Sequence, residues 1–288
     1  MGLTWPTPYG PGAGDRPAQL TAAFSPCPND TFVFHAWVHG LLPGAPKLNV
    51  TYADIDVTNG LAAAGELDLL KISYAALPWA LDEYRLLPCG GAVGRGCGPL
   101  VLVGGTRRDL RGARVGVPAL RSTAYLLFRL WAAGQDVADV EVLPFGEIMP
   151  GVRDGVIDAG LVIHEARFTY PSFGLRALAD LGTWWEEDTG LPIPLGAIVA
   201  RRSLDTAALA ERLRASLEYA WRHPGASARY VAAHAKEMDP AVQAQHIRLY
   251  VNELTRDLGE EGYAAVRALL GRAAAAGLVP PLTAGALS

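Results

Sequence analysis

The segment "GVIDAGLVIHEARFTY", residues 155–170, places a histidine directly after an apolar run. Residues 159–163 have the length and composition of a buried strand, and His164 follows them at once. The same order occurs earlier in "GELDLLKISYAAL", residues 65–77, where Tyr74 holds the position of His164. In both segments a Gly and an Asp precede the strand, and a helix is expected to follow it. We therefore infer an internal repeat of two related α/β units.

A second pair of segments supports the repeat. "TAAFSPCPNDTFVFHAW", residues 21–37, and "RVGVPALRSTAYLLFRLW", residues 114–131, each run from a strand through a Pro-containing loop into an amphipathic helix. The repeats predict two lobes, the second inserted into the first, with the chain crossing near 103–107 and returning near 192–201. The expected organisation is a flexible tail over 1–17, a first lobe over 18–104 plus 201–288, and a second lobe over 105–200.

Short apolar runs alternate with helical patterns as far as about residue 200, which predicts open, largely parallel sheets with helices on both faces. The expected strands are 19–24, 47–53, 67–72, 84–89, 98–104, 113–117, 139–143, 157–163, 174–179 and 193–201. The expected helices are 29–40, 57–65, 73–81, 121–134 and 146–154. After Arg202 the pattern is helical, with Asp205, Asp239 and Asp257 as expected caps or first-turn acids.

Composition and charge exclude several classes of protein. Half of the residues are apolar and 19% are charged, which is typical of a globular chain. The net charge of −4 gives no support for a nucleic acid or an anionic membrane as partner. Three cysteines form no disulfide framework, and the first residues lack a basic and apolar export signal. We therefore expect a cytoplasmic protein with no membrane-spanning segment.

The two-lobed organisation also predicts where a ligand would bind. In open α/β sheets ligands bind beyond the carboxyl ends of the strands. Four such ends are candidates, and they are 25–31, 71–74, 121–123 and 164–167. Each lobe contributes two of them, so we expect these segments to face one another across a cleft between the lobes.

His164 is the leading candidate for chemistry, because imidazole is a general base near neutral pH. The alternative is a structural histidine at a strand end. Glu165 could orient the ring or face solvent, and the sequence does not decide between these roles. Ser122 and Thr123 begin a predicted helix, whose free N–H groups could bind a carboxylate or phosphate or could simply be capped by the hydroxyl. Lys71 could pair with an anionic ligand or reach the surface.

Ser73 lies on the same face of the predicted strand as Lys71, so these two could contact the ligand together. Cys27 stands before a helix, where a thiol can become a nucleophile, but no basic partner is close in sequence. Asn29 or Asp30 is the simpler choice as the cap of that helix. A further candidate is a pair of histidines four residues apart, His35 and His39. The pair has zinc-binding spacing but lacks the Glu of a metalloprotease helix, and we expect no metal site there.

Three segments, "FSPCPNDTFVFHAW", "KISYAAL" and "GLVIHEARFTY", together resemble the 1,4-dihydroxy-6-naphthoate synthase family of the futalosine route to menaquinone. The resemblance extends from about residue 19 to the C-terminal helices. It implies a two-lobed, periplasmic-binding-protein-like (type II) fold with a cleft between the lobes, in agreement with the repeat.

The resemblance also implies an activity and a set of site residues. The activity is a lyase reaction that converts cyclic dehypoxanthinyl futalosine, a small-molecule carboxylate, into 1,4-dihydroxy-6-naphthoate and dihydroxyacetone, without a metal or redox cofactor. His164 matches the family's proton acceptor. The substrate-contacting positions are Lys71, Ile72, Ser73, Thr123 and Ala124.

Two other functions share this fold. A chorismate dehydratase of the same pathway has the same two lobes, and the "SPCPND" and "VIHEARFTY" segments favour the naphthoate synthase over it. A solute-binding protein for a transporter would also suit two lobes, but it has no use for a base in the cleft. The helical C-terminal part leaves a homodimer open.

Overall fold

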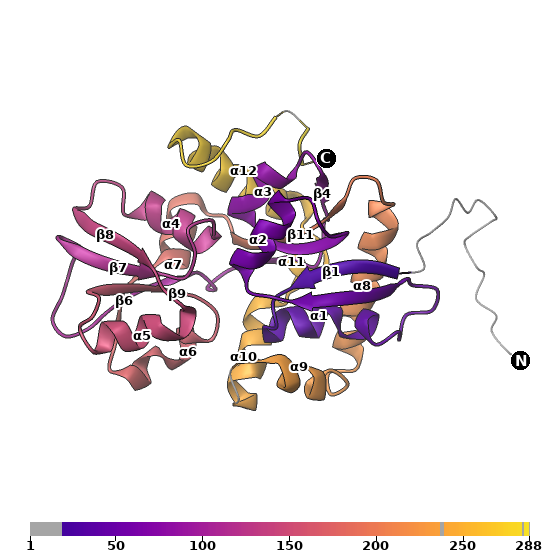
Figure 1. The fold of residues 1–288 in the computed structure, drawn as a ribbon, viewed down its shortest axis with the longest axis horizontal. Coiled ribbons are helices and arrows are strands. Elements are labelled where there is room, and N and C mark those ends of the chain that lie inside the picture. The colour runs from indigo at the N-terminus through magenta and orange to yellow at the C-terminus, as the bar shows by residue number, and fades with distance from the viewer. Residues whose placement is uncertain (1–18, 237–238, 284, 288) are drawn as a thin grey trace, which may run out of the picture.

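Two separate β-sheets organise the molecule, and they lie side by side in the two halves of Figure 1. The computed structural model describes residues 19–236, 239–283 and 285–287. The expected tail over 1–17 lies outside these residues. We call the part built on the first sheet lobe 1 and the part built on the second sheet lobe 2.

The sheet of lobe 1 has the strand order β2-β1-β3-β11-β4, and β5 also pairs with β11. Its strands are β1 (Gln19–Phe24), β2 (Lys47–Tyr52), β3 (Leu69–Ser73), β4 (Tyr84–Leu86), β5 (Ala92–Gly94) and β11 (Ile193–Arg201). β1 is parallel to β2 and to β3, whereas β11 is antiparallel to β3, β4 and β5. Every residue of β3 is buried, as expected for a central strand covered on both faces.

The sheet of lobe 2 has the order β10-β6-β9-β7-β8. Its strands are β6 (Leu100–Val103), β7 (Ala113–Val117), β8 (Val137–Val142), β9 (Ala159–Val162) and β10 (Arg176–Asp180). β7 is parallel to β8 and β9, and β6 is antiparallel to β9 and β10. β9, which leads to His164, is buried along its whole length.

Both sheets are mixed, so the expectation of largely parallel sheets is corrected. All antiparallel pairs involve β6 or β11, the strands next to the points where the chain changes lobe. A chain that arrives from the other lobe needs no crossover helix, and it can enter the sheet in either direction. β6 belongs to lobe 2 and β11 to lobe 1, whereas the expected boundaries placed residues 98–104 in the first lobe and 193–200 in the second. An apolar run does not reveal which sheet it will join, because strand pairing is non-local.

The helices agree closely with the expected pattern in most of the chain. The helices before β11 that match an expected one are α1 (Pro28–Val38), α2 (Ile55–Ala63), α4 (Thr123–Trp131) and α5 (Phe145–Arg153). The expected helix 73–81 is instead a 3-10 turn, η1 (Tyr74–Ala76), followed by the short α3 (Leu77–Ala80). The sequence pattern also missed α6 (Ala166–Thr169), the 3-10 turn η2 (Tyr170–Phe173), α7 (Leu181–Thr189) and the strand β5.

The C-terminal part is helical as predicted, and it contains α8 (Thr206–Arg222), α9 (Ala228–His234), α10 (Pro240–Tyr250), α11 (Glu253–Arg256) and α12 (Gly259–Ala275). Asp205 caps α8 and Asp239 caps α10 through their carboxylates. Asp257 follows α11, and its carboxylate accepts a hydrogen bond from the Gly259 N–H at the start of α12. No helix among the described residues is long and apolar enough to cross a membrane.

The crossing from lobe 1 to lobe 2 is a tightly packed segment between β5 and β6. Gly98 lies against the start of α7, and a Cβ atom on Gly98 would overlap the backbone nitrogen and Cα of Gly182. A Cβ atom on Gly182 would in turn lie 2.7 Å from the Gly98 nitrogen. The Gly98 carbonyl also accepts a hydrogen bond of 2.8 Å from the Arg167 guanidinium. The two glycines therefore permit the approach of backbone to backbone that joins the lobes.

Gly98→Ala is expected to lower the free energy of unfolding by about 1–3 kcal/mol, because the backbone of α7 must shift to admit the methyl group. Gly60→Ala is the matched control. Gly60 is exposed within α2 and has no atom within 4 Å of an added Cβ, so alanine should be neutral or stabilise by up to about 1 kcal/mol. Urea unfolding of both variants checks this, and equal stabilities would contradict the packing role of Gly98.

Candidate functional site

A cavity lies between the two lobes at the carboxyl ends of β1, β3, β7 and β9. All four segments that were predicted from the sequence to bind a ligand contribute residues to its wall. The lining residues from lobe 1 are Ser25, Asn29, Asp30, Ile55, Lys71, Ser73, Ala92, Cys97, Leu195, Gly196, His246 and Tyr250. Those from lobe 2 are Pro99, Ser122, Thr123, Ala124, Ile163 and His164. The two lobes thus enclose one site to which both contribute polar side chains.

His164 enters this cavity because the backbone turns sharply after β9. Its φ of 55° is in the left-handed region, and it is the non-glycine residue with positive φ in the described part of the chain. Such a conformation is unfavourable for most side chains and is found preferentially at functional sites. Tyr74, at the equivalent place in lobe 1, instead starts the turn η1 and is buried in the core. The repeat therefore diverges at the residue that bears the imidazole.

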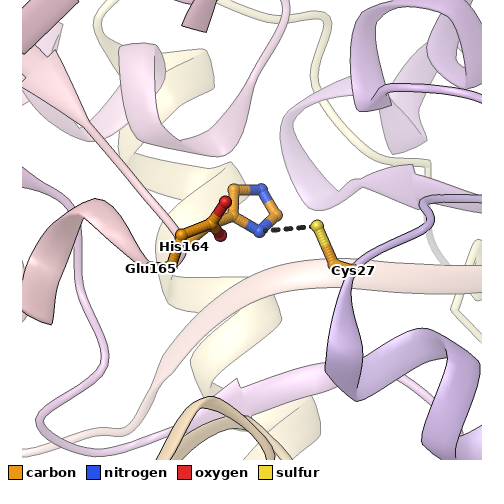
Figure 2. Close-up of side chains that lie close together, drawn as sticks. All are labelled: Cys27, His164 and Glu165. Carbon is orange, nitrogen blue, oxygen red and sulfur yellow. Dashed lines mark hydrogen bonds between the residues drawn. The ribbon is translucent and has the colours of Figure 1, made fainter. Parts of the chain in front are cut away.

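The imidazole of His164 spans the gap between the lobes and meets the thiol of Cys27, as Figure 2 shows. Its Nδ1 lies 3.1 Å from the Cys27 Sγ, which stands at the start of α1 in lobe 1. Its other nitrogen, Nε2, has no hydrogen-bond partner among the described residues. The structure thus supplies the basic partner for Cys27 that was not evident in the sequence, and it leaves Nε2 available to a ligand.

Burial keeps the thiol and the imidazole uncharged. It lowers the pKa of His164 below the ordinary value, although the carboxylates of Glu165, Asp30 and Asp54 oppose the shift. Burial also raises the pKa of the Cys27 thiol, and the Glu165 carboxylate adds to this effect. A protonated thiol is a poor nucleophile, so this site favours proton transfer by His164 over attack by Cys27.

Glu165 lies beside both groups but makes no hydrogen bond to the imidazole. Its Oε2 is buried without a partner among the described residues. The residue Glu165 lines a second cavity, which shares His164 with the first cavity and is also lined by Asp54, Asp56 and Lys236. His164 therefore stands between a mostly uncharged cavity and an acidic one.

The thiol, imidazole and carboxylate of this group also have the chemistry of metal ligands. The ligand atoms of Cys27, His164 and Glu165 all lie within 4.8 Å of one another. A metal ion would have to displace the thiol proton, which burial holds in place.

The other candidate metal-binding pair in the sequence was His35 and His39. Their rings pack on Tyr230, and the His39 Nδ1 lies 2.9 Å from the backbone oxygen of His35.

Lys71 lines the cavity, and its charge is already paired. Its Nζ lies 2.5 Å from the Asp30 Oδ1, and both side chains are almost fully buried. Gly196 on β11 makes room for this lysine, since a Cβ there would lie 2.7 Å from the Lys71 Cε. Neither Asp30 nor Asn29 caps α1, which begins at Pro28 after Cys27. The expected capping role is therefore wrong, and both side chains instead belong to a buried polar network.

Ser73, which lines the cavity, forms a hydrogen-bonded pair with Asn59. Asn59, on α2, accepts from the Ser73 N–H at 2.8 Å and donates to the Ser73 Oγ at 3.1 Å. The Ser73 hydroxyl can therefore donate its own proton to a ligand. The side chain of Ile72 lies in the hydrophobic core, because side chains alternate along β3 and Ile72 points to the other face from Lys71 and Ser73.

The N-terminus of α4 presents donors to the same cavity. Ser122 caps the helix by accepting from the Tyr125 N–H. The Thr123 hydroxyl is occupied, since it donates to the Leu195 carbonyl at 2.8 Å and accepts from the Ala75 N–H at 3.1 Å. The backbone N–H groups of Thr123 and Ala124 have no partner among the described residues. Free N–H groups at a helix start form an anion site, so this end of the cavity suits a carboxylate.

His246, Tyr250 and Asn59 line or support the site and were missed by sequence reasoning. His246 and Tyr250 lie on α10, where Gln243, His246 and Tyr250 form one buried face. The rings of His246 and His164 stack across the lobes with centroids 5.8 Å apart. Polar residues repeated at helical spacing on an inward face were the available signal, but the helix gave no indication of which sheet edge it would cover.

Comparison with known proteins identifies the family. The family model described as menaquinone biosynthesis matches residues 20–275. A relative from Streptomyces coelicolor is 65% identical over 93% of this chain and 98% of its own length, and it is named 1,4-dihydroxy-6-naphtoate synthase. A relative from Thermus thermophilus with the same name is 48% identical over 91% of this chain and 96% of its own length.

Solved structures show the same fold. A protein from Archaeoglobus fulgidus is 32% identical and superposes with a TM-score of 0.84, covering 91% of this chain and 99% of its own. The alkanesulfonate-binding protein SsuA from Xanthomonas axonopodis pv. citri is 18% identical, with a TM-score of 0.68 and coverage of 93% and 96%. The predicted two-lobed, periplasmic-binding-protein-like fold is confirmed. Given the match to the family model and to two named synthases over nearly its whole length, the chain belongs to the menaquinone biosynthesis family and is an enzyme of that process.

Proposed function

We propose that this enzyme is a lyase that converts cyclic dehypoxanthinyl futalosine into 1,4-dihydroxy-6-naphthoate and dihydroxyacetone. The observation that carries the proposal is the imidazole of His164 between the lobes, whose Nε2 has no partner among the described residues and shares a cavity with a helix N-terminus that has unpaired N–H groups. The names of the two relatives support the same reaction.

In this proposal His164 acts as the general base. Nδ1 carries the ring proton and donates it to the Cys27 Sγ, so Nε2 bears the lone pair and takes the proton from the substrate carbon. The thiol then serves as a hydrogen-bond partner that holds the ring in position rather than as a nucleophile. The electrons of the broken C–H bond enter the product ring, which becomes aromatic as its bond to the three-carbon fragment breaks. The fragment leaves with the electron pair of that bond and takes up the proton from the His164 imidazolium. Closure of the lobes excludes water and holds the reacting carbon near the base.

The substrate carboxylate is assigned to the N-terminus of α4. The free N–H groups of Thr123 and Ala124 and the donor hydroxyl of Ser73 belong to residues that line this same cavity. The second cavity, with Asp54, Asp56 and Glu165, would repel a carboxylate. The charge of Lys71 is neutralised by Asp30, and we assign it to the support of the polar network rather than to direct pairing with the substrate.

The alternative functions have less support. A chorismate dehydratase would share the fold, but both relatives carry the synthase name. The likeness to solute-binding proteins is at 18% identity, which concerns the fold alone. A binder also has no need for a strained residue that presents a neutral imidazole to its ligand.

The purified enzyme is expected to form 1,4-dihydroxy-6-naphthoate and dihydroxyacetone in equal amounts from cyclic dehypoxanthinyl futalosine, and to leave chorismate unchanged. Liquid chromatography with mass spectrometry measures both conversions. Consumption of chorismate would establish the sister activity instead. Recovery of both compounds intact after long incubation would favour a binding protein.

His164→Asn is expected to reduce kcat by about 10²–10⁴-fold, because asparagine cannot act as the base. Asparagine tolerates the left-handed backbone at this position, so the loop should keep its conformation. Circular dichroism and the melting temperature provide the control for folding. A folded variant with near-normal turnover would show that His164 is not the general base.

The acid limb of the kcat/KM profile is expected to have its midpoint below about pH 6.5, the ordinary pKa of a free imidazole. Burial lowers the pKa of His164, so the imidazole stays in its basic form to lower pH than a free imidazole does. Glu165→Gln removes a carboxylate that raises this pKa, and the acid limb of the profile should move to still lower pH. An acid limb at or above pH 6.5, or a shift toward higher pH in Glu165→Gln, would contradict this assignment.

A further inference from the structure

A second histidine in the cavity has no role in the proton transfer described above. His246, on α10, is 1% exposed and lines the same cavity as His164. Its Nε2 lies 2.9 Å from the Asn29 Oδ1. Its Nδ1 is buried and has no hydrogen-bond partner among the described residues. A buried polar atom without a partner is costly, and at the wall of a ligand cavity it indicates a group that the ligand satisfies.

The network behind His246 determines which nitrogen carries the proton. The Asn29 Nδ2 donates to the Asp30 Oδ1 at 2.8 Å, so the amide must present its oxygen to His246. Asp30 is held in turn by its ion pair with Lys71. The Nε2 of His246 is therefore the donor, and its Nδ1 carries a lone pair.

His246 also remains neutral. A second proton would place a buried positive charge near Lys71 and the ring of His164, and these groups together with burial lower the pKa of His246 well below its ordinary value. The rings of His246 and His164 are almost parallel with centroids 5.8 Å apart, and both residues line the cavity, so His246 lies next to the base. The Nδ1 atom is thus a fixed acceptor of hydrogen bonds close to the reacting atoms.

We propose that His246 Nδ1 forms a hydroxyl-binding subsite, where it accepts a hydrogen bond from a hydroxyl group of the substrate close to the reacting carbon. This assignment rests on the proposed function and adds the orientation of the substrate to it. A neutral acceptor attracts a hydroxyl and repels a carboxylate. The carboxylate therefore occupies the end of the cavity at Thr123 and Ala124, and the hydroxyl-bearing part faces α10.

Two substitutions test separately the acceptor at Nδ1 and the hydrogen bond from Nε2 to Asn29. In His246→Gln the amide nitrogen can occupy the place of Nε2 and preserve the bond to Asn29, while the acceptor at Nδ1 is lost. In His246→Asn the shorter amide can place its oxygen near Nδ1, but it cannot reach Asn29. Steady-state kinetics with cyclic dehypoxanthinyl futalosine and thermal unfolding without ligand are measured for both variants and the wild type.

The proposal predicts opposite orders for activity and stability. His246→Gln should keep a melting temperature close to that of the wild type and lose about 10- to 100-fold in kcat/KM, mainly through KM. His246→Asn should melt a few degrees lower and retain more kcat/KM than His246→Gln. A purely structural histidine would give the same order in both measurements, with His246→Gln the more active variant, and that result would overturn the subsite.

The outcome also distinguishes this proposal from the one on which it rests. Wild-type enzyme that leaves cyclic dehypoxanthinyl futalosine unchanged would overturn the proposed function, and with it the hydroxyl assignment. Wild-type turnover accompanied by unchanged kinetics in His246→Gln would overturn the subsite alone.

Discussion

The site depends on the burial of one imidazole between two lobes. His164 leaves β9 in a left-handed conformation and meets the thiol of Cys27 on the other lobe. This contact can form only when the lobes are together, and the same closure removes water from the ring. Removal of water keeps the imidazole uncharged, and an uncharged imidazole is the form that can accept a proton. The contact between the lobes therefore both encloses the site and keeps His164 in its basic form.

The polar groups around His164 divide into those that are satisfied within the protein and those that have no partner among the described residues. Lys71, Asp30 and Asn29 form a chain of buried contacts that ends on His246. Among the described residues, the groups without a partner include the Glu165 Oε2, the His164 Nε2, the His246 Nδ1 and the first N–H groups of α4. A buried polar chain holds side chains rigidly when each member is paired. The unpaired atoms therefore occupy set positions and define a pattern of donors and acceptors for the substrate.

The fold itself explains how a binding architecture can perform chemistry. The lobes share their fold with the alkanesulfonate-binding protein SsuA, whose structure has MOPS bound. Within this chain the two lobes differ locally, because a strand end of lobe 2 presents His164 where the matching strand end of lobe 1 presents a core tyrosine. Fold alone does not determine function, and the function here follows from the residues at these strand ends.

Sequence reasoning predicted the layout well where the signal was local. The β1 and β7 strands, the helical C-terminal part and the gathering of four strand ends around one cavity all follow from periodicity and from the internal repeat. It could not assign β6 and β11 to their lobes, because both are apolar runs whose pairing partners are distant in the chain. It also missed His246, since no local pattern shows that α10 closes the cavity over β1 and α1. The capping role expected of Asn29 and Asp30 was wrong for the same reason, because their true partners lie far away in sequence.

A crystal structure of the enzyme with 1,4-dihydroxy-6-naphthoate bound would test this arrangement of the site. We expect the naphthoate ring to lie between the lobes, with its carboxylate on the N–H groups of Thr123 and Ala124 and its oxygen-bearing ring beside the His164 Nε2. A product molecule bound outside this cavity, or one with its carboxylate against His246, would contradict it.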